Sequence, residues 1–159
     1  MMTYFEGDTK IIALPGESRI GTQEGKAAYL EAVDFLKKQK GGLQSLKRMK
    51  GLDAACKQHC EDIGPKGIGG HQGSDGTQPG ERFNQHGKWL RGCAENISFG
   101  SRSAKAALIS WIIDDGVPSR GHRTNLFKPE MDCFGSWDYT HKVYGCSVTM
   151  GFANGYTNK

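Results

Sequence analysis

Two histidines and two glutamates, each in a glycine-containing stretch, are the residues of this chain best suited to chemistry. His71 lies in GHQGSDG and His122 in RGHRTN. Glu81 lies in PGERF and Glu95 in CAENISFG. Imidazoles and carboxylates bind zinc and similar divalent ions, and the same groups can transfer protons. Their spacing matches no compact metal motif such as HExxH, so the residues alone allow a metal site, an acid–base site or separate structural roles.

Of the four residues, Glu95 most needs a partner, because in the sequence it stands close to the apolar Ile97 and Phe99, which suggest burial. A carboxylate buried without a partner is costly, and a histidine from a neighbouring loop would supply that partner. Near His71 and His122 in the sequence, Ser74 and Ser119 are the candidate nucleophiles. Each would need a histidine as its base.

Length and composition predict one globular domain with no nucleic-acid partner. The chain has 159 residues, of which 36% are apolar and 24% charged, and its net charge of +4 is only mildly basic. The basic segment 37–50 is either a solvated helix end or a site for an anionic surface. No apolar run reaches the length of a membrane span, and the first residues lack the apolar core of a signal peptide.

The elements that must position these residues follow from periodicity. Apolar spacings of three and four predict amphipathic helices at 23–39, 43–63 and 103–114, the last one N-capped by Ser103. Between them we expect a long glycine-rich loop at 64–80, a short helix at 80–87, and a helical turn or buried loop at 94–100.

The last third of the chain changes to β-branched and aromatic residues. Residues 132–140 and 143–153 are predicted to form two antiparallel strands. Helices first and strands last indicate the α+β class. Five cysteines are present, an odd number, so at least one is unpaired within the chain. Cys133 and Cys146 flank the hairpin and could form a bridge, or the cysteines could all be buried thiols.

The ordered set GLDAACKQHCED, HQGSDG, ERF, AENISFG, WIIDDG, GHRTNLFKP and FGSW resembles the CAP superfamily of cysteine-rich secretory, antigen 5 and pathogenesis-related 1 proteins. The resemblance covers about residues 25–153 and is similar to the bacterial and protist type. It implies a single-domain three-layer α-β-α sandwich with a central antiparallel sheet. We therefore expect an N-terminal arm at 1–21 and the CAP domain at 22–159.

The resemblance also implies a central cleft with two histidines and two acids. His71 and His122 match the histidines, and Glu95 matches the glutamate of a motif that here has Ala94 in place of glycine. Glu81 is our choice for the second acid, with Asp75 as the alternative. We expect His122 to hydrogen-bond to Glu95 and to face His71.

Three functions remain open on this basis. The resemblance implies a secreted, extracellular binding protein that takes a lipid or sterol, a glycan or a protein, with Zn²⁺ or another divalent cation on His71 and His122. The second is a hydrolase that uses a metal-bound water, or Ser74 or Ser119. The third is a purely structural histidine–glutamate network, with a partner bound elsewhere on the surface. Of these we expect a binding protein rather than an enzyme.

Overall fold

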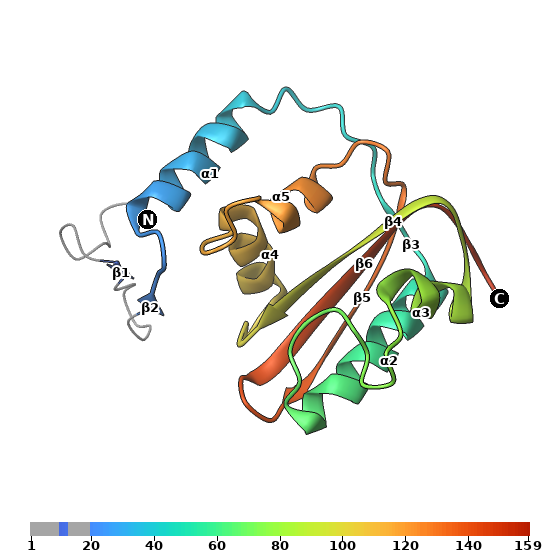
Figure 1. The fold of residues 1–159 in the computed structure, drawn as a ribbon. Coiled ribbons are helices and arrows are strands. Elements are labelled where there is room, and N and C mark those ends of the chain that lie inside the picture. Colours follow the sequence, from blue (N-terminus) through green and yellow to red (C-terminus); the bar gives the residue numbers. More distant parts are fainter. Residues whose placement is uncertain (1–9, 13–19) are drawn as a thin grey trace.

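A four-stranded sheet in the order β3-β5-β6-β4 organises the chain (Figure 1). The computed structural model describes residues 10–12 and 20–159. Strands β5 and β4 each pair with β6 in antiparallel fashion, whereas the two-residue β3 pairs with β5 in parallel. The elements are β1 Ile11–Ile12, β2 Ile20–Gly21, α1 Lys26–Lys38, β3 Lys47–Arg48, α2 Lys50–Lys66, α3 Pro79–His86, β4 Gly87–Phe99, α4 Ala104–Ile113, α5 Gly121–Leu126, β5 Cys133–His141 and β6 Gly145–Asn158.

Helices cover both faces of this sheet, which confirms the predicted α+β class and the three-layer sandwich. Figure 1 shows α2 and α3 on one face, and α4 and α5 on the other, with α1 outside them. The sheet is mixed rather than wholly antiparallel, because β3 runs parallel to β5. The predicted arm at 1–21 lies for the most part outside the described residues.

Helix α2 packs directly on the strand backbones. A Cβ at Gly135 of β5 would collide with the backbone nitrogen of Asp53, and one at Gly151 of β6 would lie 2.7 Å from the Phe83 ring. Glycine at these positions lets α2 and α3 approach the sheet closely. The resulting core contains Leu52, Ala55, Phe83, Ala153 and Tyr156, all under one-tenth exposed.

A charged network fixes α1 to the start of α5. The guanidinium of Arg120 donates to Glu24 at 2.6 Å and to Glu31 at 2.7 Å, and Arg123 donates to Glu31 at 2.7 Å. A small apolar cluster of Ala28, Ala32 and Ile113 lies between α1 and α4. The two arginines around His122 are therefore structural, and they hold the segment that presents the histidine.

Three local predictions were wrong. Residues 94–100 belong mostly to the long strand β4, with Glu95 opposite Gly151 of β6, and not to a helical turn or loop. Helix α2 begins only at Lys50 because residues 47–48, just before it, pair with β5. The helix continues through Pro65 to Lys66 and is capped by Gly67, whose φ of 67° is left-handed. The segment Gly121–Leu126, for which the sequence analysis predicted no helix, is the helix α5.

All five cysteines are free thiols, and the suggested bridge between Cys133 and Cys146 is not formed. Cys133 pairs with Ala153, whereas Cys146 pairs with Thr140, so the two thiols stand at opposite ends of the β5–β6 hairpin. Burial raises the pKa of every one of the five thiols. Thiols with a raised pKa are poor nucleophiles at neutral pH, so the cysteines offer no catalytic group.

Candidate functional site

Glu95 forms a buried ion pair at the outer strand of the sheet. Its side chain is 1% exposed, as is that of Arg82 from α3. Nη2 of Arg82 donates to both carboxylate oxygens, at 3.1 and 2.9 Å. Nδ1 of His71 lies 2.9 Å from Oε1 of the same carboxylate. An ionised carboxylate only accepts hydrogen bonds, so Nδ1 of His71 carries the proton of this bond.

The loop between α2 and α3 positions His71. Asp62 of α2 accepts hydrogen bonds from the backbone nitrogen of Ser74 at 2.7 Å and from its hydroxyl at 2.6 Å. Nη1 of Arg82 donates to the carbonyl of Thr77 at 3.0 Å. Nε2 of His59, a fully buried histidine of α2, lies 3.0 Å from the carbonyl of Gly70. The loop is long but is anchored at both ends, which fixes the direction of the histidine.

His122 forms a second pair of the same kind with Asp114. Its Nδ1 lies 2.7 Å from Oδ1 of Asp114, whose side chain is 2% exposed. Oδ2 of Asp114 accepts from the backbone nitrogens of His122 at 2.9 Å and Arg123 at 3.2 Å. The carboxylate of Asp114 thus accepts from free N–H groups at the start of α5 and at the same time orients the His122 ring. Asn96 of β4 donates to the carbonyl of His122 at 3.0 Å, which ties α5 to the sheet.

These contacts correct the expected pairing. We expected His122 to bond to Glu95, but the structure pairs Glu95 with His71 and His122 with Asp114. Sequence reasoning missed Asp114. The only signal for it was an aspartate pair that ends an apolar helix eight residues before the histidine.

Neither candidate for the second acid contacts the histidines. Oε2 of Glu81 accepts from the backbone nitrogen of Gln78 at 2.7 Å and completes a capping box at the start of α3. Asp75 is exposed and accepts from Thr77, whose hydroxyl and backbone N–H hold the pKa of Asp75 below its usual range. Both carboxylates therefore stabilise local backbone.

The two serines are not paired with histidine within the described residues. The hydroxyl of Ser74 donates to Asp62 and accepts from Lys66 Nζ at 2.5 Å. Lys66 is half-exposed and ion-paired with Asp62, and an ammonium in that state is no general base. Ser119 is exposed on the turn before α5. The site thus lacks the nucleophile–base contact of a serine hydrolase.

The donor set fits a metal ion held by two imidazoles. In metal sites a ligating histidine commonly donates its other N–H to a carboxylate, as both histidines do here. Their Nε2 atoms form no hydrogen bond with any described residue. The described part of the chain has no group of three or more His, Cys, Asp or Glu side chains that could hold one ion.

Comparison with known proteins decides the family. Residues 19–150 match the family described as CAP, Cysteine-rich secretory protein family. The chain belongs to the CAP family. A search of curated proteins found no match to this CAP protein.

Three solved bacterial structures resemble this CAP protein. An outer surface protein of Borrelia burgdorferi has a TM-score of 0.60 at 19% identity, covering 84% of this chain and 92% of that one. An extracellular SCP-domain protein of Bacillus anthracis has a TM-score of 0.59 at 22% identity, covering 71% and 35% of the two chains. A cysteine-rich secretory protein of Staphylococcus aureus has a TM-score of 0.53 at 14% identity, covering 87% and 42%. At these identities the likeness shows the shared fold.

The CAP chain spans well under half the length of the Bacillus and Staphylococcus proteins, and nearly all of the Borrelia one. Within the described residues, no helix has both the length and the apolar character needed to cross a membrane.

Proposed function

We propose that this CAP protein is a non-catalytic binding domain that acts outside the cell, and that His71 and His122 bind a divalent cation, most simply zinc. One observation carries the proposal. Each histidine has its Nδ1 fixed by a carboxylate that is at most 2% exposed, while the ring itself remains 48% exposed in His71 and 24% exposed in His122. That arrangement fixes the tautomer and leaves Nε2 as the metal-binding atom.

Strand β4 is the outer strand of the sheet, so both histidines can stand beside its free edge. His71 reaches this strand through Glu95, and the backbone of His122 reaches it through Asn96. Zinc usually has four ligands, so two imidazoles leave two positions for oxygen atoms of a lipid headgroup, a glycan or a protein. The cation would thus join the domain to its ligand.

Binding is favoured over hydrolysis by the state of the candidate nucleophiles. Ser74 is held by Asp62 and Lys66, and the cysteine thiols have raised pKa values. The two carboxylates of the site are occupied in orienting histidines. The similar proteins include an outer surface protein and an extracellular protein, which supports an extracellular location for this chain.

Calorimetric titration of zinc at pH 7.5 tests the proposal. We expect the wild-type protein to bind one equivalent, and the His71→Ala/His122→Ala variant to bind none. His86→Ala is the matched control, because the ring of His86 bonds to Gln58 of α2 rather than to Glu95 or Asp114, and its loss should leave zinc binding intact. The absence of binding to the wild type, or full binding to the double variant, would refute the cation site.

A further inference from the structure

The sheet has a second free edge, on strand β5, that is unrelated to the histidine site. Strand β3 pairs with only two residues of β5, Cys133 and Phe134, whereas β6 pairs with β5 along its whole length. Beyond β3, four consecutive residues are exposed, namely Trp137, Asp138, Tyr139 and Thr140. Because successive side chains point to opposite faces, Asp138 and Thr140 are exposed on the face of α4, while Trp137 and Tyr139, each 37% exposed, lie on the face of α2.

The backbone groups of this edge point away from the sheet and lack partners. The carbonyl of Phe134 accepts from Met49, and the backbone nitrogen of Ser136 donates to Asp53 at 2.9 Å, so even-numbered residues of β5 direct their backbone groups outward. By the same alternation the carbonyl of Ser136, both backbone groups of Asp138, and the N–H of Thr140 also point outward. None of these four forms a hydrogen bond with another described residue.

The open segment has defined ends. Toward the start of β5, β3 and the Asp53 side chain occupy the outward positions. Toward its end, the backbone nitrogen of Lys142 donates to the carbonyl of Gly64 in α2 at 2.9 Å. The edge of β5 from Ser136 to Thr140 thus has two free N–H donors and two free carbonyl acceptors. They alternate along the strand as they do where two strands pair in a sheet.

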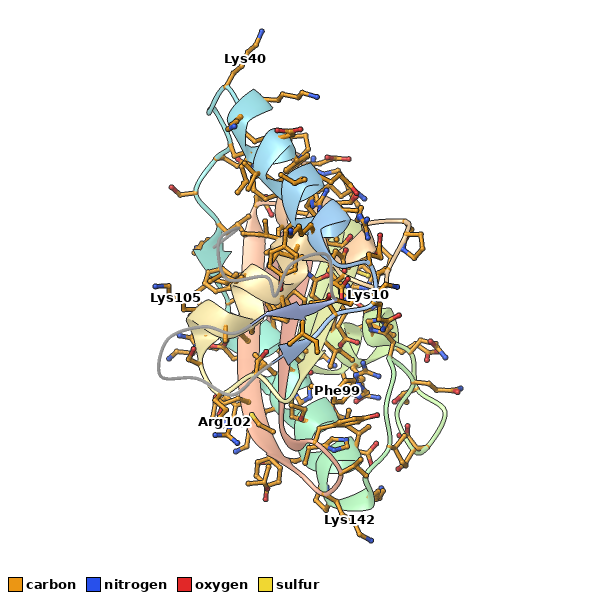
Figure 2. The ribbon with its side chains drawn as sticks, turned by 90° about the vertical axis from the view of Figure 1, so that its left-hand side faces the viewer. Lys10, Lys40, Phe99, Arg102, Lys105 and Lys142 are labelled. Carbon is orange, nitrogen blue, oxygen red and sulfur yellow. The ribbon has the colours of Figure 1, made fainter. Side chains whose placement is uncertain are left out.

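A groove of about 580 Å³ runs beside this edge, on the face covered by α4. Ser136 and Asp138 of β5 line one side of it, and Ser101 and Arg102, just before α4, line the other. Figure 2 shows Arg102 pointing outward from the body of the molecule. Alternate side chains of a strand added to β5 would enter this groove, while the others would pack beside Trp137 on the opposite face.

Charge decides the kind of occupant. The guanidiniums of Arg48 and Arg102 and the carboxylate of Asp138 line the groove, Arg48 is ion-paired with Asp53 at 3.0 Å, and the whole chain carries a net charge of +4. Arg102 forms no ion pair with any described residue. A second copy of this chain is disfavoured, because an antiparallel β5–β5 pair centred on Asp138 would place two like charges opposite each other.

We propose that the edge of β5 from Ser136 to Thr140 binds an extended acidic segment of a protein partner by strand addition. Backbone hydrogen bonds to Ser136, Asp138 and Thr140 supply the affinity, and Arg102 in the groove selects acidic side chains. The proposal stands apart from the cation site, because its residues lie on the opposite edge of the sheet.

Amide hydrogen exchange with a defined probe gives the first test. The probe is the acetylated and amidated peptide Glu-Val-Glu-Val-Glu-Val-Glu. In the free protein we expect fast exchange at Asp138 and Thr140, and slow exchange at Trp137 and Tyr139, whose N–H groups point to β6. The peptide should slow exchange at Asp138 and Thr140 by about tenfold or more. Slow exchange there in the free protein, or no change with the peptide, would overturn the proposal.

Fluorescence anisotropy with the labelled peptide gives the second test. N-methylation of alternate residues of the peptide, or replacement of its glutamates by lysine, should weaken binding by at least about tenfold. Asp138→Pro should do the same, because it removes an outward N–H that β6 does not use and is thus tolerated in an edge strand. Asp138→Asn, which keeps the N–H and loses the like charge, should bind more tightly. Equal affinities across these pairs would overturn strand addition.

Discussion

Truncating Glu95 should cost this protein a large part of its stability. Glu95→Ala leaves the guanidinium of Arg82, 1% exposed, with the carbonyl of Thr77 as its one hydrogen-bond partner among the described residues. Removing one partner of a buried ion pair costs about 3–5 kcal/mol, because the other charge stays buried without compensation. For a chain of this length that corresponds to a fall in Tm of roughly 6–20 °C.

Urea unfolding followed by circular dichroism measures this loss. Glu61→Ala is the control, since Glu61 is an exposed residue 3.9 Å from Lys57, and its removal should change the free energy of unfolding by less than about 0.5 kcal/mol. The double variant Arg82→Met/Glu95→Leu should recover at least half of the loss, because both charges are then absent. A cost below about 1 kcal/mol for Glu95→Ala would show that Arg82 and Glu95 are not buried as a pair.

Three further perturbations follow from the same contacts. Asp114→Ala removes the acceptor of His122 and of the α5 backbone, and should lower the free energy of unfolding by about 2–4 kcal/mol in urea titrations. The hydrogen bond from Arg120 lowers the pKa of Glu24 from 4.5 to about 2. The ionised carboxylate therefore stabilises the fold above pH 4.5, and this stabilisation is lost as the pH falls toward 2. Arg120→Ala should raise the pKa of Glu24 in NMR titrations. Burial lowers the pKa of His59 below 6.5, so at mildly acidic pH the unfolded chain binds a proton that the folded chain does not. The free energy of unfolding measured in urea should therefore fall as the pH drops below 6.5. The fall should be smaller in His59→Gln.

Local patterns predicted α1 and the start of α4. Helix α1 falls within the amphipathic segment 23–39, and the hydroxyl of Ser103 accepts from the backbone nitrogen of Ala106, as expected of an N-cap. The sequence also predicted that Glu95 bonds to a histidine, because a buried carboxylate requires a hydrogen-bond partner. The histidine proved to be His71 rather than His122.

Strand β4 could not be recognised from alternation, because both of its faces are covered in the middle. Glu95 faces α2 and α3, while Asn96 and Ser98 face α4 and α5, so polar residues occur on both sides. Each is tolerated because it has a specific hydrogen-bond partner from another element. Asp114 was missed because its contact with His122 depends on a left-handed backbone conformation, with a φ of 56°, which no local sequence pattern predicts for an aspartate.

Long-range proton–nitrogen NMR spectra of the histidine rings test the central claim most directly. The account predicts that His71 and His122 carry their proton on Nδ1, and that one equivalent of zinc shifts the Nε2 resonances of these two rings. His141 is an internal reference for the opposite tautomer, since its Nδ1 accepts the backbone N–H of Val143. Protonation on Nε2 in His71 or His122, or zinc-induced shifts confined to other histidines, would contradict the account.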